Sequence, residues 1–197
     1  MIFLYVVRLT VLSACTVLFS LCGCTGPAIT GCSAVKLVAD GNLKAFETWV
    51  ARVAPDVPDC NGAPLIVLIL EEDVPHGDVA VGILLRFGVD ANVSDPRSKR
   101  TALHAASGWG AFETVKTLLE HGADSNAKDS RGTTPLMNIA GTRGTPRARD
   151  IVDLLVKSGA SLEARDPYGK TAADYAKSAG NPDLQNYIEQ LQSIQNK

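Results

Sequence analysis

The histidines are the residues of this 197-residue chain that are best suited to acid–base or metal chemistry. His104 lies in the stretch TALHAASGWG, His121 directly precedes Gly122, and His76 follows an acidic run at 71–73. Imidazole and carboxylate groups bind metals, but this run lacks the ligand spacing of a known site, so we expect a solvated loop. The sequence contains no GxSxG, P-loop or HExxH motif. We therefore predict no catalytic residue, no metal, no cofactor and no enzyme activity.

Charge and composition narrow the classes of partner. The chain has 19 Lys and Arg against 21 Asp and Glu, a formal net charge of −2. A protein held mainly by nucleic-acid phosphates is strongly basic. Nucleic acid is therefore not an expected partner.

The N-terminal leader, MIFLYVVRLTVLSACTVLFSLCGCTGPAITGC, contains a single charged residue, Arg8. The apolar run 9–21 has the length of the hydrophobic region of a signal peptide and is short for a membrane span. Counted from Ile2, the run reaches about 20 residues, so an uncleaved anchor interrupted by Arg8 is an alternative, as is an ordinary cleaved secretory signal.

The end of the leader, Leu21-Cys22-Gly23-Cys24, resembles the lipobox of bacterial lipoproteins. The resemblance implies cleavage after residue 23, diacylation of Cys24 and a lipid-anchored protein on the periplasmic side of the cell envelope. A second match ends at Cys15, but too few apolar residues separate it from Arg8.

Cys32 and Cys60 are the two cysteines that would remain as free thiols. An even pair in an oxidising compartment favours a disulfide. The alternative is two unpaired, small apolar side chains.

Three segments of the chain repeat one pattern: GVDANVSD at 88–95, GADSNAKD at 122–129 and GASLEARD at 159–166. A threonine follows each segment, at Thr101, Thr134 and Thr171, and a branched apolar pair precedes each initial glycine. The offset between Thr101 and Thr134 is 33 residues. Such a period indicates a repeat architecture, in which no unit buries its apolar face alone.

The repeated pattern resembles the ankyrin repeat, D-x-x-G-x-T-P-L-H-x-A-A followed by a helix that ends L-L-x-x-G-A. The resemblance covers about 160 residues and implies an all-α solenoid of stacked helix–turn–helix units with β-turn loops. We expect a signal peptide (1–23), a flexible tether (24–32), an N-terminal capping repeat (33–58), central repeats (59–94, 95–128 and 129–165, the last with an insertion between its helices), a C-terminal capping repeat (166–192) and a tail (193–197).

The residue types fit this architecture on physical grounds. Threonine followed by proline caps and pre-sets the start of a helix. Val115, Leu118 and Leu119 share one helical face, and Gly122 supplies the positive φ that ends the helix. His104 occupies the T-P-L-H slot, where the resemblance implies hydrogen bonds between adjacent loops and a structural role. Equivalent positions hold Ile66, Met137 and Asp174, so there is no row of ligands.

Two repeats are longer than the third by four residues between their helices. The first insert region, 71–78, is acidic, and the second, 141–150, is basic. Insertions in repeats map to loops and often to binding faces. The alternative is neutral drift in a tolerant loop.

Ankyrin stacks bind proteins through the β-turn tips and the exposed side of the first helices. The resemblance therefore implies a protein partner for this chain. We expect the protein itself to be a monomer. An exposed tryptophan beside arginine and tyrosine is typical of a binding hot spot; the alternative is that Trp109 packs under the neighbouring insert. These slots carry more basic than acidic residues, which favours an acidic or polar partner. The predicted contact residues are Arg97, Lys99, Trp109, Arg131, Thr133, Tyr168 and Lys170.

The sequence thus predicts a non-enzymatic protein-binding module in the bacterial envelope. One alternative is an immunity or inhibitor protein that neutralises a periplasm-delivered toxin or lipolytic enzyme. Another is a purely structural envelope component.

Overall fold

The computed structural model describes residues 31–52, 62–71 and 74–195. Within these ranges the elements are helices, and Ser94 and Thr101 form an isolated antiparallel bridge. The helices are α2 (Gly31–Ala39), α3 (Leu43–Val50), α4 (Leu65–Glu71), α5 (Gly77–Arg86), α6 (Ala102–Trp109), α7 (Phe112–Glu120), α8 (Pro135–Ala140), α9 (Ala148–Lys157), α10 (Ala172–Ser178) and α11 (Pro182–Gln195).

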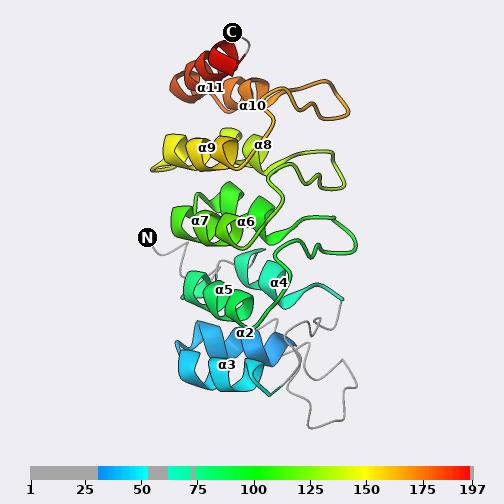
Figure 1. Cartoon of the computed structure of the whole chain (residues 1–197), viewed down its shortest axis with the longest axis vertical. Coiled ribbons are helices and arrows are strands. Elements are labelled where there is room, and N and C mark those ends of the chain that lie inside the picture. Colours follow the sequence, from blue (N-terminus) through cyan, green and yellow to red (C-terminus); the bar gives the residue numbers. More distant parts are fainter. Residues whose placement is uncertain (1–30, 53–61, 72–73, 196–197) are drawn as a thin grey trace, which may run out of the picture.

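The helices form antiparallel pairs that stack along one axis (Figure 1). Second helices contact one another in the order α3, α5, α7, α9 and α11, and first helices contact one another from α2 through α4, α6 and α8 to α10. The connecting loops project from the side of the first helices (Figure 1). The predicted all-α repeat fold is confirmed. Helix α2 begins at Gly31, inside the segment 24–32 that the sequence assigns to a flexible tether.

The predicted helix boundaries follow from their end residues. Thr134 precedes α8, its hydroxyl oxygen accepts a hydrogen bond from the Met137 amide at 3.4 Å, and Pro135 is the first helical residue. Thr101 and Thr171 occupy the same position before α6 and α10. Thr134 and Thr171 each satisfy an amide that the first turn of a helix leaves without a partner.

The core lies between the two rows of helices. Leu103, Leu118, Leu136 and Leu155 are fully buried, and small side chains such as Ala106 let neighbouring helices approach. Truncation of such a leucine to alanine costs about 2–5 kcal/mol, since the surrounding side chains only partly refill the cavity. Stacking is therefore the main source of stability, because one helix pair offers only half of this core.

Asparagine side chains also join consecutive repeats. The Asn126 side-chain oxygen accepts a hydrogen bond from the Ser161 amide at 2.8 Å, and its Nδ2 donates to the Gly159 carbonyl at 2.8 Å. Asn92 makes the equivalent pair of bonds one repeat earlier. Each link satisfies one donor and one acceptor of the next turn, which fixes the register between repeats.

Candidate functional site

Three hairpin loops form one side of the stack, and we define them as loop 1 (94–101), loop 2 (128–134) and loop 3 (165–171). In loop 2, an Asp129 carboxylate oxygen accepts hydrogen bonds from the amides of Arg131 and Thr133, both at 2.9 Å. Asp95 and Asp166 accept two amide hydrogen bonds each in the same way. Each aspartate thus holds its loop in one conformation.

The pKa values of these aspartates reflect their bonding. Amide donation from Ser98 holds the pKa of Asp95 below its usual value. Burial raises the pKa of Asp129, but hydrogen bonds from Thr133 and Arg131 outweigh it and lower the pKa overall. The aspartates are therefore ionised at neutral pH and turned toward their own loops.

The outward surface of the loops is basic. Loops 1 to 3 contain three carboxylates, all of them the inward-turned aspartates, and seven cations. The side chains of Arg97, Lys99, Arg131 and Lys170 are exposed. Because the cations outnumber the carboxylates, an approaching molecule meets a net positive charge at these loops. The seven cations are Arg97, Lys99, Arg100, Lys128, Arg131, Arg165 and Lys170.

His104 joins loop 1 to loop 2. Its Nδ1 is 3.2 Å from the Thr101 amide nitrogen and 2.9 Å from the Thr101 hydroxyl, and its Nε2 lies 3.0 Å from the Thr133 carbonyl. Asn138 adds a second link, because its Nδ2 donates to the His104 carbonyl at 3.1 Å. His104 is fully buried, and burial lowers its pKa. The predicted structural position of His104 agrees with these contacts.

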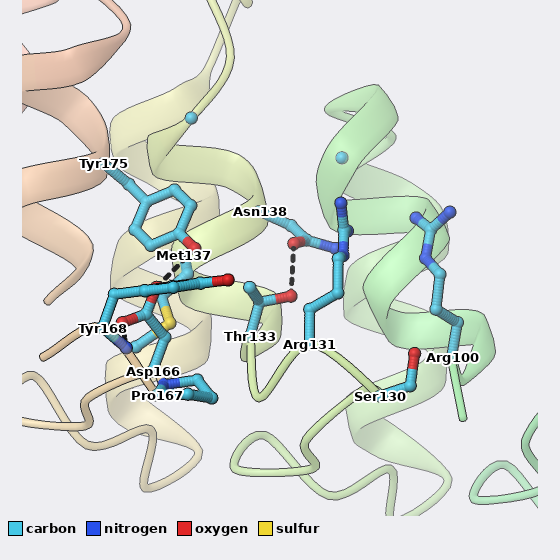
Figure 2. Close-up of a pocket in the computed structure, with 12 residues that line it drawn as sticks. Arg100, Ser130, Arg131, Thr133, Met137, Asn138, Asp166, Pro167, Tyr168 and Tyr175 are labelled. Carbon is cyan, nitrogen blue, oxygen red and sulfur yellow. Dashed lines mark hydrogen bonds between the residues drawn. The ribbon is translucent and has the colours of Figure 1, made fainter. Parts of the chain in front are cut away.

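A surface cavity of about 580 Å³ lies over α8, between loops 2 and 3. Figure 2 shows Arg100 and Arg131 on one side of it and Tyr168 and Tyr175 on the other. The cavity is lined by Arg100, Gly108, Ser130, Arg131, Thr133, Met137, Asn138, Gly141, Asp166, Pro167, Tyr168 and Tyr175.

Asp166 and Tyr175 form one wall of the cavity. The Tyr175 hydroxyl donates to Asp166 at 2.9 Å (Figure 2), and burial together with this bond raises the pKa of Tyr175 to about 12. Burial raises the pKa of Asp166, but hydrogen bonds from the Lys170 amide and the Tyr175 hydroxyl lower it by a larger amount. The pKa of Asp166 therefore lies below its usual value. The carboxylate is thus already saturated by donors and leaves little acceptor capacity for a ligand.

The structure brings together some of the predicted contact residues and separates others. Arg131 and Tyr168 line the cavity, and Tyr168 is 87% exposed. Arg97, Lys99 and Lys170 lie in loops 1 and 3 but do not line it.

Thr133 is buried, contrary to its prediction as an exposed contact residue. Its amide is held by Asp129, its carbonyl faces His104, and its hydroxyl donates to Asn138 at 3.3 Å. The loop geometry therefore turns this side chain toward α8, where it lines the cavity floor.

Trp109 is the last residue of α6, and its side chain is 57% exposed. This agrees with the predicted exposed tryptophan and not with burial under the neighbouring insert. That insert packs beside it: the Thr145 side chain lies against Gly110, where an added Cβ would clash with Thr145 Cγ2.

Sequence reasoning missed Arg100, Asn138 and Tyr175 as lining residues. Asn138 and Tyr175 both lie four residues after the helix-starting threonine of their repeat, at Thr134 and Thr171. The equivalent position in the repeat that contains His104 is an alanine, Ala105. A polar or aromatic residue at this position could therefore have indicated a lining residue from the sequence.

The two inserts lie between paired helices, as predicted, and contact neighbouring repeats. In the second insert, the guanidinium of Arg147 lies 3.4 Å from the centroid of the Phe112 ring and pairs with Glu113 at 3.4 Å and Asp150 at 3.0 Å. In the first insert, the His76 ring lies against Gly41. These contacts give the inserts a role in stacking.

The acidic run beside His76, for which the sequence predicts a solvated loop and no metal, is only partly described. Glu71 pairs with Arg100 at 3.2 Å, and residues 72–73 lie outside the described residues. No group of three or more potential metal-ligating side chains occurs within 31–52, 62–71 and 74–195.

The predicted leader and cysteine features lie outside what the structure describes. These are the signal peptide, the lipidation site Cys24, and Cys60 together with the side chain of Cys32. Among the helices of the described part of the chain, none combines the length and apolar character needed to cross a bilayer.

Comparison with known protein families identifies the repeats in part of the chain. Residues 33–129 match the family model described as "Ankyrin repeats (3 copies)". The matched segment contains three helix pairs, from α2–α3 to α6–α7, and the same arrangement continues through α11.

Curated relatives carry similar segments inside much longer proteins. The chain is 30% identical over 151 residues to the E3 ubiquitin-protein ligase KEG of Arabidopsis thaliana, covering 72% of this chain and 9% of that protein. It is 39% identical over 94 residues to diacylglycerol kinase iota of Homo sapiens, covering 46% of this chain and 8% of that protein. It is 36% identical over 112 residues to protein phosphatase 1 regulatory subunit 12A of Rattus norvegicus, covering 57% of this chain and 10% of that protein. The chain spans about a tenth of the length of each relative.

Proposed function

We propose that this ankyrin-repeat solenoid is a non-enzymatic module that binds a partner protein through loops 1 to 3 and the adjoining ends of the first helices. The observation that carries the proposal is the orientation of charge. All carboxylates of the loops bond to their own amides, whereas the side chains of Arg97, Lys99 and Lys170 are exposed. An acidic surface on the partner fits this arrangement, because complementary charge speeds association and sets specificity.

The loops are preorganised for binding. Asp129 fixes loop 2 through two amide bonds, and His104 fixes loop 2 against loop 1. A surface that is already ordered loses little conformational entropy when a partner docks.

Exposed aromatic residues supply candidate anchors. Tyr168 at the tip of loop 3 is 87% exposed, and Trp109 at the end of α6 is 57% exposed. Tyrosine, tryptophan and arginine are enriched among the residues that dominate the binding energy of protein interfaces, and the rigid rings of tyrosine and tryptophan bury a large area at a small entropic cost.

We test this function by capture of crosslinked partners with the full-length protein. The double substitution Arg131→Gln with Tyr168→Ala removes one cation and one aromatic anchor from the proposed face. Lys116→Gln, on α7 and remote from the loops, is the control for the lost charge. Loss of the partner in the double variant only supports the proposal, and equal capture by both variants contradicts it.

The identity of the captured partner separates two biological roles. A delivered toxin or lipolytic enzyme indicates an immunity protein, whereas a resident envelope protein indicates a scaffold. Support for either role comes from the leader, which indicates export.

The leader also leads us to propose lipid anchoring through Cys24. The support is the lipobox-like sequence Leu21-Cys22-Gly23-Cys24. Cys24→Ser should abolish incorporation of labelled palmitate and release the protein from membranes. Cys22→Ser should still incorporate the label and remain attached to membranes. Continued labelling of the Cys24→Ser protein contradicts the proposal.

A further inference from the structure

We infer that the cavity over α8 binds a carboxylate side chain carried on an extended segment of the partner, between Arg100 and Arg131. The inference rests on the proposed function and assigns a ligand chemistry to one part of the binding face.

The two arginines give the cavity its donors. Arg100 Nη1 lies 3.2 Å from Glu71, and Arg131 Nη2 lies 3.2 Å from Asp129, so each guanidinium has an ion pair on one edge. The Arg131 side chain is 68% exposed, which leaves further N–H groups open to the cavity side.

The acceptors of the cavity are already in use. Asp166 is the one carboxylate among the lining residues, and it accepts hydrogen bonds from the Tyr175 hydroxyl and the amides of Tyr168 and Lys170. An incoming group therefore meets exposed N–H groups of Arg131 and a carboxylate, Asp166, that already accepts three hydrogen bonds. A carboxylate fits this setting, since guanidinium groups bind carboxylates through paired hydrogen bonds.

Two glycines keep the cavity floor open. Gly141 has a φ of −75°, and Gly108 lies within α6 without a positive φ, so neither backbone conformation requires glycine. A Cβ on Gly108 would have one neighbour, Arg100 Nη2 at 4.0 Å, and a Cβ on Gly141 would come no closer than 3.4 Å to any atom. Gly108 lies within a helix, where glycine is disfavoured relative to alanine, and the fold itself does not demand it.

Gly132 in loop 2 shows the contrast. Its φ is +74°, and a Cβ there would lie 2.6 Å from Pro167 Cδ. The fold requires that glycine, whereas Gly108 and Gly141 leave room beside α8 that a partner backbone can approach closely.

The third side of the cavity is apolar. Pro167 and the exposed ring of Tyr168 rise from loop 3, opposite the arginines (Figure 2). An acidic residue flanked by apolar atoms therefore matches the cavity better than a freely hydrated anion.

The experiment selects ligands from a displayed library of random ten-residue peptides with the full-length protein. We expect the selected peptides to contain an excess of Asp and Glu over Lys and Arg. Gly108→Leu, which fills the floor, and Arg131→Gln should each weaken the dissociation constant of a selected peptide by about tenfold or more. Gly108→Ala provides a milder block should the leucine disturb folding.

Gly82→Leu is the matched control, because Gly82 lies within α5 and a Cβ there would meet no atom within 4 Å. It gains the same helix propensity as Gly108→Leu but lies away from the cavity. Peptides without an acidic excess, or equal affinity for the Gly108→Leu and Gly82→Leu proteins, overturn the inference.

This result is separable from the test of the proposed function. If Arg131→Gln with Tyr168→Ala loses the captured partner while Gly108→Leu binds selected peptides normally, the binding face stands and the carboxylate site is wrong. If neither set of variants changes binding, both proposals fail.

Discussion

The imidazole Nε2 of His104 lies 3.0 Å from the carbonyl oxygen of Thr133, across the boundary between two repeats. The Thr101 amide points at Nδ1 of the same ring, so Nδ1 accepts and Nε2–H donates. One neutral side chain thereby fixes the start of its own helix and the next loop. The proposed binding face depends on this contact, because loops 1 and 2 carry most of its cations.

Replacement of His104 should destabilise the protein strongly. His104→Ala leaves the Thr101 amide and the Thr133 carbonyl without their buried partner and opens a void, so we expect a loss of about 2–4 kcal/mol in the free energy of unfolding. Denaturant titration of the full-length protein followed by circular dichroism measures the loss. His121→Ala, at an exposed helix end, should change stability by less than about 0.5 kcal/mol. Similar losses for both variants would contradict the structural role of His104.

Acid should weaken the fold through the same residue. Burial lowers the folded-state pKa of His104 below 6.5, so below pH 6.5 the unfolded chain binds a proton that folded His104 excludes. Stability is therefore fully present above about pH 6.5 and falls as the pH decreases, by up to about 1.4 kcal/mol per pH unit. Asp129 does not contribute in this window, because its pKa lies below 3.8.

Denaturant titrations at pH 7.5 and pH 5.5 measure this dependence. His104→Gln should show a smaller difference between the two pH values than the unmodified protein, and His121→Gln should not. An unchanged difference in the His104→Gln protein would assign the acid sensitivity to other groups.

Replacement of Lys99 by glycine should raise the stability of the fold and weaken partner binding. Its φ is +56°, a left-handed conformation that loops 2 and 3 give to Gly132 and Gly169. Lys99→Gly relieves this strain and should raise stability by about 1 kcal/mol, while it removes one outward cation and weakens partner binding. Thermal unfolding and a binding titration of the same sample measure both effects. A stabilised variant with undiminished binding would remove Lys99 from the binding face.

Ser107 should be replaceable with a gain in stability. Its Oγ is buried in α6 and has no hydrogen-bond partner within the described ranges. Ser107→Ala removes this unsatisfied group and raises helix propensity, so we expect stabilisation of about 1 kcal/mol. The exposed Ser178→Ala, at the end of α10, should gain less than about 0.5 kcal/mol. Destabilisation of the Ser107→Ala protein would reveal a hydrogen bond to a segment outside those ranges.

Local sequence patterns were sufficient to predict the repeat architecture. Thr134 and Pro135 determine where a helix starts, and Gly122 determines where one ends, because caps and positive φ act within a few residues. The exposed position of Trp109 also followed from its place at a helix end.

The cavity could not be predicted in the same way. It depends on the distance between loops 2 and 3 and on side chains from consecutive repeats, such as Arg100, Asn138 and Tyr175. Thr133 was misplaced because the direction of its side chain is determined by contacts with Asp129 and Asn138, which no single repeat reveals.

The most direct test of the outward-cation account compares two proteins with equal loss of charge. One carries Gln at Arg97, Lys99, Arg131 and Lys170, and the other carries Gln at the exposed helical residues Lys36, Lys44, Lys116 and Lys157. The measurement is the yield of the crosslinked partner from cell envelopes. We predict that the loop variant loses the partner and the helix variant retains it. Equal loss from both proteins, or retention by both, would contradict binding through the loops.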